Sequence, residues 1–166
     1  PDHPDVAVIL DKLAEILRKV GRNKEANPLY QRALAICTST LGKSHPDTAQ
    51  SMNHLAECLE AIGDYEQAES LYQEALRISE SVSGKDHPLS ASYMDSLAGL
   101  LKAIGDYDQA EALYRRAIEI SEKSIGKDHP DLAVSLNNLA SLLQAKGNYA
   151  EVEAMYRRTL EIYENA

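Results

Sequence analysis

The sequence predicts an all-α chain, an α-solenoid made of four tandem helical hairpins. The dipeptide His-Pro recurs at a constant step of 42 residues, beginning at His3, His45, His87 and His129. The two middle copies share 24 of 42 positions without a gap. A constant period of this length is typical of supersecondary units that stack because none can bury its apolar face alone. We therefore expect a single repeat array over residues 1–166, with units at about 3–44, 45–86, 87–128 and 129–166.

Each unit opens with a helix that starts at the proline. In the second unit this helix is expected over residues 46–62, because apolar residues recur there at spacings of three and four. They are Ala49, Met52, Leu55, Ala56 and Leu59. Proline suits the first helical position, since it has no N–H group to leave unpaired. We interpret the histidine before each proline as a cap of the opening turn.

The second helix of each unit begins after a glycine and a capping residue. Gly63 suits the left-handed conformation that closes a helix, and Asp64 is a good N-cap for the helix that follows. That helix is expected over residues 65–82, with an apolar stripe at Ala68, Leu71, Tyr72, Ala75 and Ile78. The same pattern, shifted by 42 residues, predicts eight helices and no strands.

Composition excludes several kinds of partner. The net charge is −9 and basic residues do not cluster, which argues against binding to nucleic acid. No apolar run approaches the roughly 18 residues that span a bilayer, and no signal pattern opens the chain, so we expect no membrane association. Because the chain begins at Pro1 and not at methionine, we expect it to be a piece of a longer protein.

The two cysteines argue against a metal site or a disulfide framework. Cys37 and Cys58 do not recur with the period and form no paired motif. We expect both to be small apolar fillers, which fits a reducing compartment and a cytoplasmic protein.

The repeated residues resemble the tetratricopeptide repeat (TPR). The pattern is Leu97-Ala98, Gly105-Asp106-Tyr107, Ala110, Tyr114 and Ala117. The longer period, the opening His-Pro-Asp and the string Leu136-Asn137-Asn138-Leu139-Ala140 resemble the kinesin light chain type of this repeat. The resemblance covers the whole chain and implies a right-handed solenoid with the first helices on its inner wall. It identifies the repeat type and not the partner, because such repeats occur in many scaffold, signalling and regulatory proteins.

On that arrangement, a binding groove is lined by first-helix residues that lie off the buried stripe. These are Val8, Asp11, Lys12, Glu15, Arg18, Gln50, Asn53, His54, Glu57, Glu60, Ser92, Asp95, Ser96, Gly99, Lys102, Val134, Asn137, Asn138, Ser141 and Gln144. The framework repeats while this wall varies, which is what an interaction module needs. We therefore expect a protein-binding scaffold or adaptor. Its candidate contact residues are Asp11, Glu15, Asn53, His54, Glu57, Glu60, Asp95, Lys102, Asn137, Asn138, Ser141 and Gln144.

The wall residues indicate the chemistry of the ligand. Asparagines such as Asn53, Asn137 and Asn138 can bond a peptide backbone through both donor and acceptor. The alternative is that they bond neighbouring helices or water; the two readings have equal weight for Asn137, whereas ligand contact is favoured for Asn138. The acidic side chains favour a ligand with some positive charge, although a charged helical face is often only solvated.

One ligand known for the family is not expected. The TPR domains that grip a C-terminal carboxylate use Lys, Asn and Arg on their first helices. The corresponding positions here hold Asp11, Glu15, His54, Ser92 and Ser96. A carboxylate clamp is therefore not predicted.

An enzyme is not expected. The four recurring histidines lie on stacked repeats roughly 10 Å apart, the spacing of packed helices, so one metal ion cannot bridge them. No nucleophile, base and acid recur together, and no glycine-rich phosphate loop is present. We expect no cofactor.

A structural role is the remaining alternative. The chain would then be a spacer or a self-associating segment of a larger protein. Solenoid ends normally carry a polar cap, and the sequence shows none after the last helix. We expect end-to-end stacking through a face that bears Val152, Met155, Tyr156 and Leu160.

Overall fold

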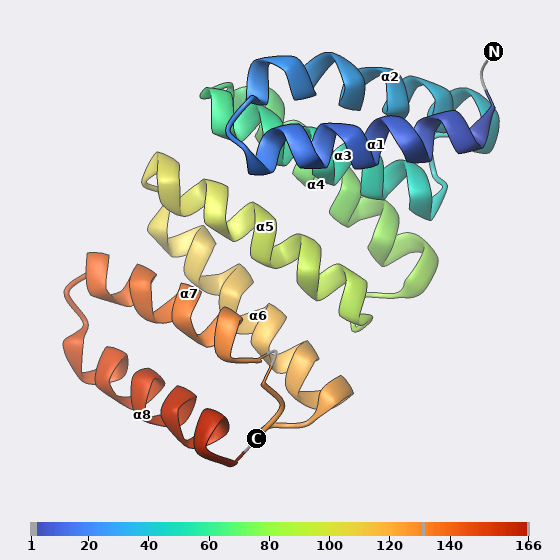
Figure 1. Ribbon diagram of the computed structural model, residues 1–166. Helices are drawn as coiled ribbons and strands as arrows, with labels where there is room; N and C mark the ends of the chain where they lie inside the picture. The colour runs from blue at the N-terminus through green and yellow to red at the C-terminus, as the bar shows by residue number, and fades with distance from the viewer. Residues whose placement is uncertain (1–2, 131, 166) are drawn as a thin grey trace. The chain divides into compact units, whose positions relative to one another are not determined.

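The computed structural model describes residues 3–130 and 132–165 (Figure 1). Within these residues the secondary structure consists of eight α-helices and no strand. The helices are α1 (Pro4–Lys19), α2 (Asn23–Leu41), α3 (Pro46–Ile62), α4 (Tyr65–Ser83), α5 (Pro88–Ile104), α6 (Tyr107–Ile125), α7 (Leu132–Ala145) and α8 (Tyr149–Asn165). The fold class is all-α, as predicted, with two helices in each 42-residue repeat.

The helices belong to two compact bodies, which we call the N-terminal and C-terminal bodies. The first ends at Val82 and the second begins at Ser83, so each contains two repeats. In the N-terminal body α2 packs against both α1 and α3. In the C-terminal body α6 packs against both α5 and α7, and α7 packs against α8. Within each body, the second helix of one repeat therefore lies against the first helix of the next.

The recurring histidines cap the first helices, as predicted. His45 has an extended backbone, and its Nδ1 accepts a hydrogen bond of 3.2 Å from the backbone N–H of Asp47. His3 and His87 accept the equivalent bond at 3.2 and 3.1 Å. This bond satisfies one of the N–H groups that a helix leaves unpaired at its start. The predicted cap at His129 adjoins residue 131, which lies outside the described residues, and α7 is described from Leu132.

In the two middle repeats glycine closes the first helix and aspartate opens the second. Gly63 adopts a left-handed conformation with φ of 88°, and the backbone N–H of Asp64 donates to the carbonyl of Leu59 at 2.9 Å. The Asp64 carboxylate then accepts from the backbone N–H of Gln67 at 3.3 Å. These local contacts explain why the predicted helix bounds agree with α3 and with the start of α4.

Small residues and tyrosines form the repeated core. The alanines common to the repeats are fully buried, at Ala14, Ala56, Ala98 and Ala140 in first helices and Ala33, Ala75 and Ala117 in second helices. They allow backbones to approach closely. Tyr30, Tyr72 and Tyr114 are also buried, whereas the equivalent Tyr156 in α8 is exposed. The residues predicted to line the wall lie on the first helices, but Asn53, which was expected off the buried stripe, is itself buried.

Candidate functional site

The predicted wall residues of α1 and α3 lie together in the N-terminal body. His54 of α3 donates from Nδ1 to the Asp11 carboxylate of α1 at 2.8 Å. Arg18 of α1 forms an ion pair with Glu57 of α3 at 2.9 Å. The two bonds link successive repeats. We call the predicted candidates on these helices the N-terminal wall: Asp11, Glu15, Asn53, His54, Glu57 and Glu60.

Most of the acidic groups of the N-terminal wall have partners within the chain. Glu57 also accepts from the amide Nδ2 of Asn53 at 3.0 Å, Glu60 accepts from the Tyr72 hydroxyl at 3.0 Å, and Glu15 pairs with Lys19 at 2.6 Å. These carboxylates are therefore already neutralised or hydrogen-bonded. The expected preference for a basic ligand receives no support from this geometry.

Burial and pairing shift the pKa values of the wall. The hydrogen bond to Asp11 raises the pKa of His54, against the opposing effect of burial. Burial raises the pKa of Glu60, although the Tyr72 hydroxyl lowers it in part. Burial also raises the pKa of Tyr30, which lies under the wall, to about 12. Charge in this wall is thus controlled by neighbouring side chains.

A depression of about 330 Å³ opens in the N-terminal wall. Five of the predicted wall residues line it, namely Val8, Asp11, Lys12, Gln50 and His54. Its remaining lining comes from Pro4, Ala7, Cys37, Leu41, Asp47 and Ser51. Ala7, Cys37 and Ser51 are buried beneath it. The sequence identified the rim of this depression but not its floor, because Cys37 belongs to the neighbouring helix α2.

The C-terminal wall comprises the candidates Asp95, Lys102, Asn137, Asn138, Ser141 and Gln144. Lys102 Nζ of α5 donates to Ser141 Oγ at 2.6 Å, and Ser135 Oγ of α7 donates to Asp95 Oδ2 at 2.6 Å. Asp95 Oδ1 is buried and has no hydrogen-bond partner among the described residues. Burial raises the pKa of Asp95 to about 6. The structure again brings wall residues of successive repeats together.

Three amide side chains of α7 differ from the rest of both walls. Asn137 and Gln144 are exposed and Asn138 is half-buried. None of the three makes a hydrogen bond or ion pair with another described residue. Their donors and acceptors are available to a ligand, unlike those of the buried Asn53.

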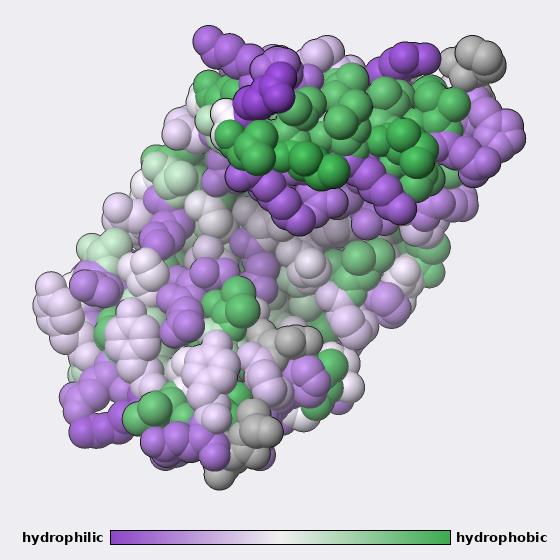
Figure 2. All heavy atoms as spheres, viewed as in Figure 1, coloured by the Kyte–Doolittle hydropathy of each residue, from purple (hydrophilic) through white to green (hydrophobic). Residues whose placement is uncertain are grey.

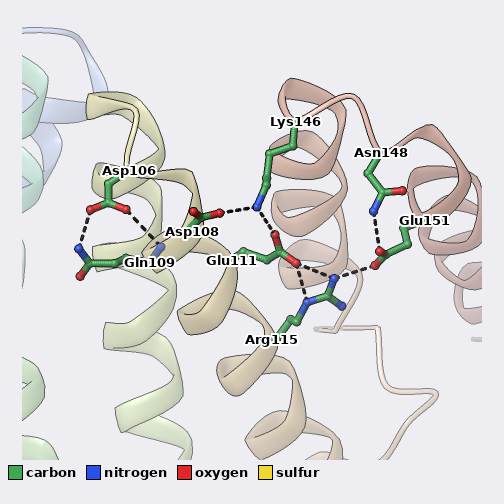
Figure 3. Close-up of polar contacts among 8 residues, drawn as sticks. All are labelled: Asp106, Asp108, Gln109, Glu111, Arg115, Lys146, Asn148 and Glu151. Atoms are coloured by element: carbon green, nitrogen blue, oxygen red, sulfur yellow. Dashed lines mark hydrogen bonds and ion pairs between the residues drawn. The ribbon is translucent and has the colours of Figure 1, made fainter.

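A cluster of ion pairs that the sequence did not predict joins α6 to α8 and to Lys146, the residue that follows α7 (Figure 3). Lys146 Nζ lies 2.7 Å from both Asp108 and Glu111. Arg115 bridges Glu111 and Glu151 at 2.8 and 2.7 Å. One sequence signal was available: Lys146 occupies a position that is apolar in the other repeats, at Val20, Ile62 and Ile104.

Two kinds of site are absent from the described residues. They contain no group of three or more His, Cys, Asp or Glu side chains placed to hold a metal ion. Among them, no helix combines the length and the apolar character that crossing a membrane requires.

Comparison with known proteins agrees with the repeat pattern. A family model described as tetratricopeptide repeat matches residues 5–81, 53–123 and 95–165. A search of curated proteins found no significant match.

Solved structures share the fold across nearly the whole chain. BtubC (BKLC) from P. vanneervenii is 27% identical with a TM-score of 0.87; the match covers 98% of this chain and 65% of BtubC, so the chain spans about two thirds of that protein. A putative kinesin light chain from Podosopora anserina, with nearly identical TPR-like repeats, is 26% identical with a TM-score of 0.87. The match covers 99% of this chain and 78% of that one. A Rap protein complexed with competence and sporulation factor is 19% identical, with a TM-score of 0.84. The match covers 96% of this chain and 43% of the Rap protein, and at this identity it shows a common fold only.

Proposed function

Because the chain belongs to the tetratricopeptide repeat family, with repeats of the kinesin light chain type, we propose that it is a protein-binding module whose first-helix walls hold an extended peptide or partner segment. It acts as a scaffold or adaptor, catalyses no reaction and needs no cofactor. The repeats share a buried framework while their wall side chains differ, and such a division suits recognition of a particular partner.

The observation that carries the proposal is the set of free amides on α7. An extended peptide brings one N–H and one C=O per residue, and burying either without a partner costs free energy. Asn137, Asn138 and Gln144 each offer a donor and an acceptor that no other described residue uses. They are therefore able to bond a peptide backbone without breaking a bond of the fold.

The depression in the N-terminal wall supports a second kind of contact. Its volume of about 330 Å³ lies at the small end of the range of ligand pockets. Ala7, Val8 and Leu41 give it an apolar lining, and Asp11 and His54 lie among its polar lining residues. A side chain of the partner fits such a site. A basic partner is not required, since the nearby carboxylates are already paired.

We also place the module in the cytoplasm. Cys37 and Cys58 are both free and buried. Free thiols are typical of proteins from reducing compartments.

Selection from a random-peptide library tests the function without knowledge of the natural partner. We expect the wild-type protein to enrich a family of peptides. Replacing two of the three amides together, Asn137→Ala with Asn138→Ala, should weaken peptide binding about tenfold, since two hydrogen bonds to the ligand are lost. The melting temperature should not fall, because neither side chain bonds another described residue.

Gln31→Ala is the matched control, because Gln31 is an exposed amide on a second helix, outside both walls. This variant should bind the selected peptides as tightly as the wild type. Equal binding by the double variant would contradict the proposed wall. A library that yields no binder would instead favour the spacer role.

A further inference from the structure

The first helix carries an exposed apolar row. Ile9, Leu13 and Ile16 are 63%, 47% and 60% exposed, and Val20 continues the row. Their spacing of three and four places them on one face of α1. Figure 2 shows hydrophobic surface gathered over this helix. An apolar row of this kind on a helix is typical of a packing surface.

The same positions are buried in the later first helices. Ser51, Leu55 and Cys58, one repeat after the α1 row, are buried in α3. Ser51 Oγ lies 3.4 Å from Cys37 Sγ of α2, and Cys58 Sγ lies 3.3 Å from the carbonyl of Asn23 at the start of α2. This row is therefore the face by which a first helix packs on the second helix before it. On α1 this row is exposed, and no other described residue of the N-terminal body covers it.

The last helix carries the complementary exposed face. Tyr149 and Tyr163 of α8 are 67% and 56% exposed, and Tyr156 and Leu160 lie between them, also exposed. The residues equivalent to Tyr156 are Tyr30 in α2 and Tyr114 in α6, and both are buried. Val152, which the sequence placed on this face, is instead buried and contributes no exposed surface.

The repeat register pairs the two faces residue by residue. Equivalent residues of two repeats differ in number by a multiple of the 42-residue period. The equivalents of Ser51 on α1 and of Cys37 on α8 are Ile9 and Tyr163. The equivalents of Cys58 and Asn23 are Ile16 and Tyr149. Where α3 packs on α2, these positions hold small or polar residues. On the exposed faces they hold isoleucine in α1 and tyrosine in α8. All four of these terminal side chains are exposed.

Two further correspondences fit the same register. His54 of α3 lies with its ring centroid 6.1 Å from that of Tyr30, and the equivalent pair is Lys12 with Tyr156. A lysine over a tyrosine ring is a favourable cation–π contact. Ile118 of α6 and Leu139 of α7 line one shared depression, and the equivalent pair is Leu160 with Leu13.

Charge also matches across the two faces. Arg115 of α6 bonds Glu151 of α8 at 2.7 Å (Figure 3). The equivalent pair is Arg157 of α8 with Glu25 of α2. In the single chain Arg157 instead pairs with Glu153 of α8, and Glu25 pairs with Arg22, which directly precedes α2. Exposed ion pairs of this kind contribute little to stability. Exchanging them for one ion pair between two molecules therefore costs little free energy.

We propose that α8 of one molecule packs on α1 of a second copy of this chain, in the register by which α2 packs on α3. The contact is heterologous, since each molecule contributes a different face. It involves none of the three free amides of the C-terminal wall, which carry the proposed function, so it stands independently of them.

Single-cysteine variants test the register directly. Ile9→Cys and Tyr163→Cys place thiols at positions equivalent to the Ser51–Cys37 contact. Mixing the two variants under mild oxidation should give a disulfide-linked dimer of one chain of each kind, and neither variant alone should form one. The native cysteines should not react, because Cys37 and Cys58 are buried.

A cysteine one residue away provides the control. Val8→Cys lies at an exposed neighbouring position that points to a different side of α1. Mixed with Tyr163→Cys, it should give at most about a tenth of the cross-linked dimer, because the register is missed. Cross-linking of Ile9→Cys alone would indicate symmetric pairing of α1 with α1 and would overturn the proposal. Equal cross-linking by the control would also overturn it.

Sedimentation of the unmodified chain measures the strength of the contact. The mean mass should rise with protein concentration, and Ile16→Asp should weaken association at least about tenfold by placing a charge in the apolar row. Its melting temperature at low concentration should match the wild type, because Ile16 is largely exposed. A constant monomer mass for the wild type would overturn the proposal.

A charge exchange tests the rim of the contact. Arg157→Glu alone should weaken association about two- to fivefold, as expected for one exposed ion pair. Combining it with Glu25→Arg in the same chain should restore the wild-type strength. Failure of the double variant to recover would contradict the pairing of these two residues.

Discussion

One position of the repeat is occupied in turn by Asp11, Asn53, Asp95 and Asn137. The first bonds His54 of the next repeat, the second bonds Glu57 on its own helix, the third accepts from Ser135, and the fourth has no partner among the described residues. The framework fixes where the side chain lies. The residue type and its neighbouring side chains determine whether this position is charged, links two helices or is free for a ligand.

Asp95 provides a pH-dependent prediction at this position. Burial raises its pKa from 3.8 to about 6, although the hydrogen bond from Ser135 lowers it in part. Because the folded state retains a proton that the unfolded state releases, this group's contribution to stability is greatest below pH 3.8 and falls as the pH rises through about 6. Asp95→Asn should therefore increase the free energy of unfolding at pH 7 by up to about 3 kcal/mol.

Urea unfolding at about pH 4 and pH 7 checks this prediction. The variant should gain stability mainly at the higher pH, and asparagine is compatible with the site because two other repeats carry it there. Asp128→Asn, which changes an exposed carboxylate, is the control and should change stability little at either pH. A loss of stability for Asp95→Asn at pH 7 would show that the carboxylate is favourable where it lies.

At the scale of the helix, two glycines of α5 allow a matched test. Gly105 closes the helix at a φ of 90°, a conformation that strains any residue with a Cβ. Gly99 lies inside the same helix, where an added Cβ would meet only the Tyr114 hydroxyl at an ordinary contact distance of 3.6 Å. We expect Gly105→Ala to lose about 1–2 kcal/mol of stability and Gly99→Ala to gain up to about 1 kcal/mol. Urea unfolding of the two variants side by side measures both effects, and the reverse order would contradict this account of the helix end.

Helix bounds could be predicted from the sequence because their signals are local. Pro46 starts α3, Gly63 ends it and Asp64 caps α4, and each acts through residues close to it in the chain. The first-helix walls could also be placed, since they follow from the period. The state of each wall residue could not, because a bond such as that of Lys102 with Ser141 depends on a side chain about one repeat away. The sequence therefore assigned residues to a wall whose role in binding stays a prediction, and it could not tell paired from free side chains.

At the scale of the whole molecule, stability in a repeat array is close to a sum over neighbouring helices. The interior helices α2 and α6 each pack on a helix before and a helix after them. α1 and α8 each leave an apolar face exposed. The net charge of −9 opposes the approach of a second copy at low ionic strength. Association through these faces should accordingly strengthen as salt is raised to physiological levels, unlike a contact dominated by ion pairs.

Hydrogen exchange at two protein concentrations tests this view of the array. At low concentration the backbone amides of α1 and α8 should exchange faster than those of α2 and α6, since local opening of a helix with one exposed apolar face costs less. At high concentration the amides of α1 and α8 should become protected together, because each contact covers one of each. Those of α6 should not change. Protection of the α8 amides without those of α1 would contradict the contact between α8 and α1. Equal exchange in all four helices at low concentration would contradict the view that stability is a sum over neighbouring helices.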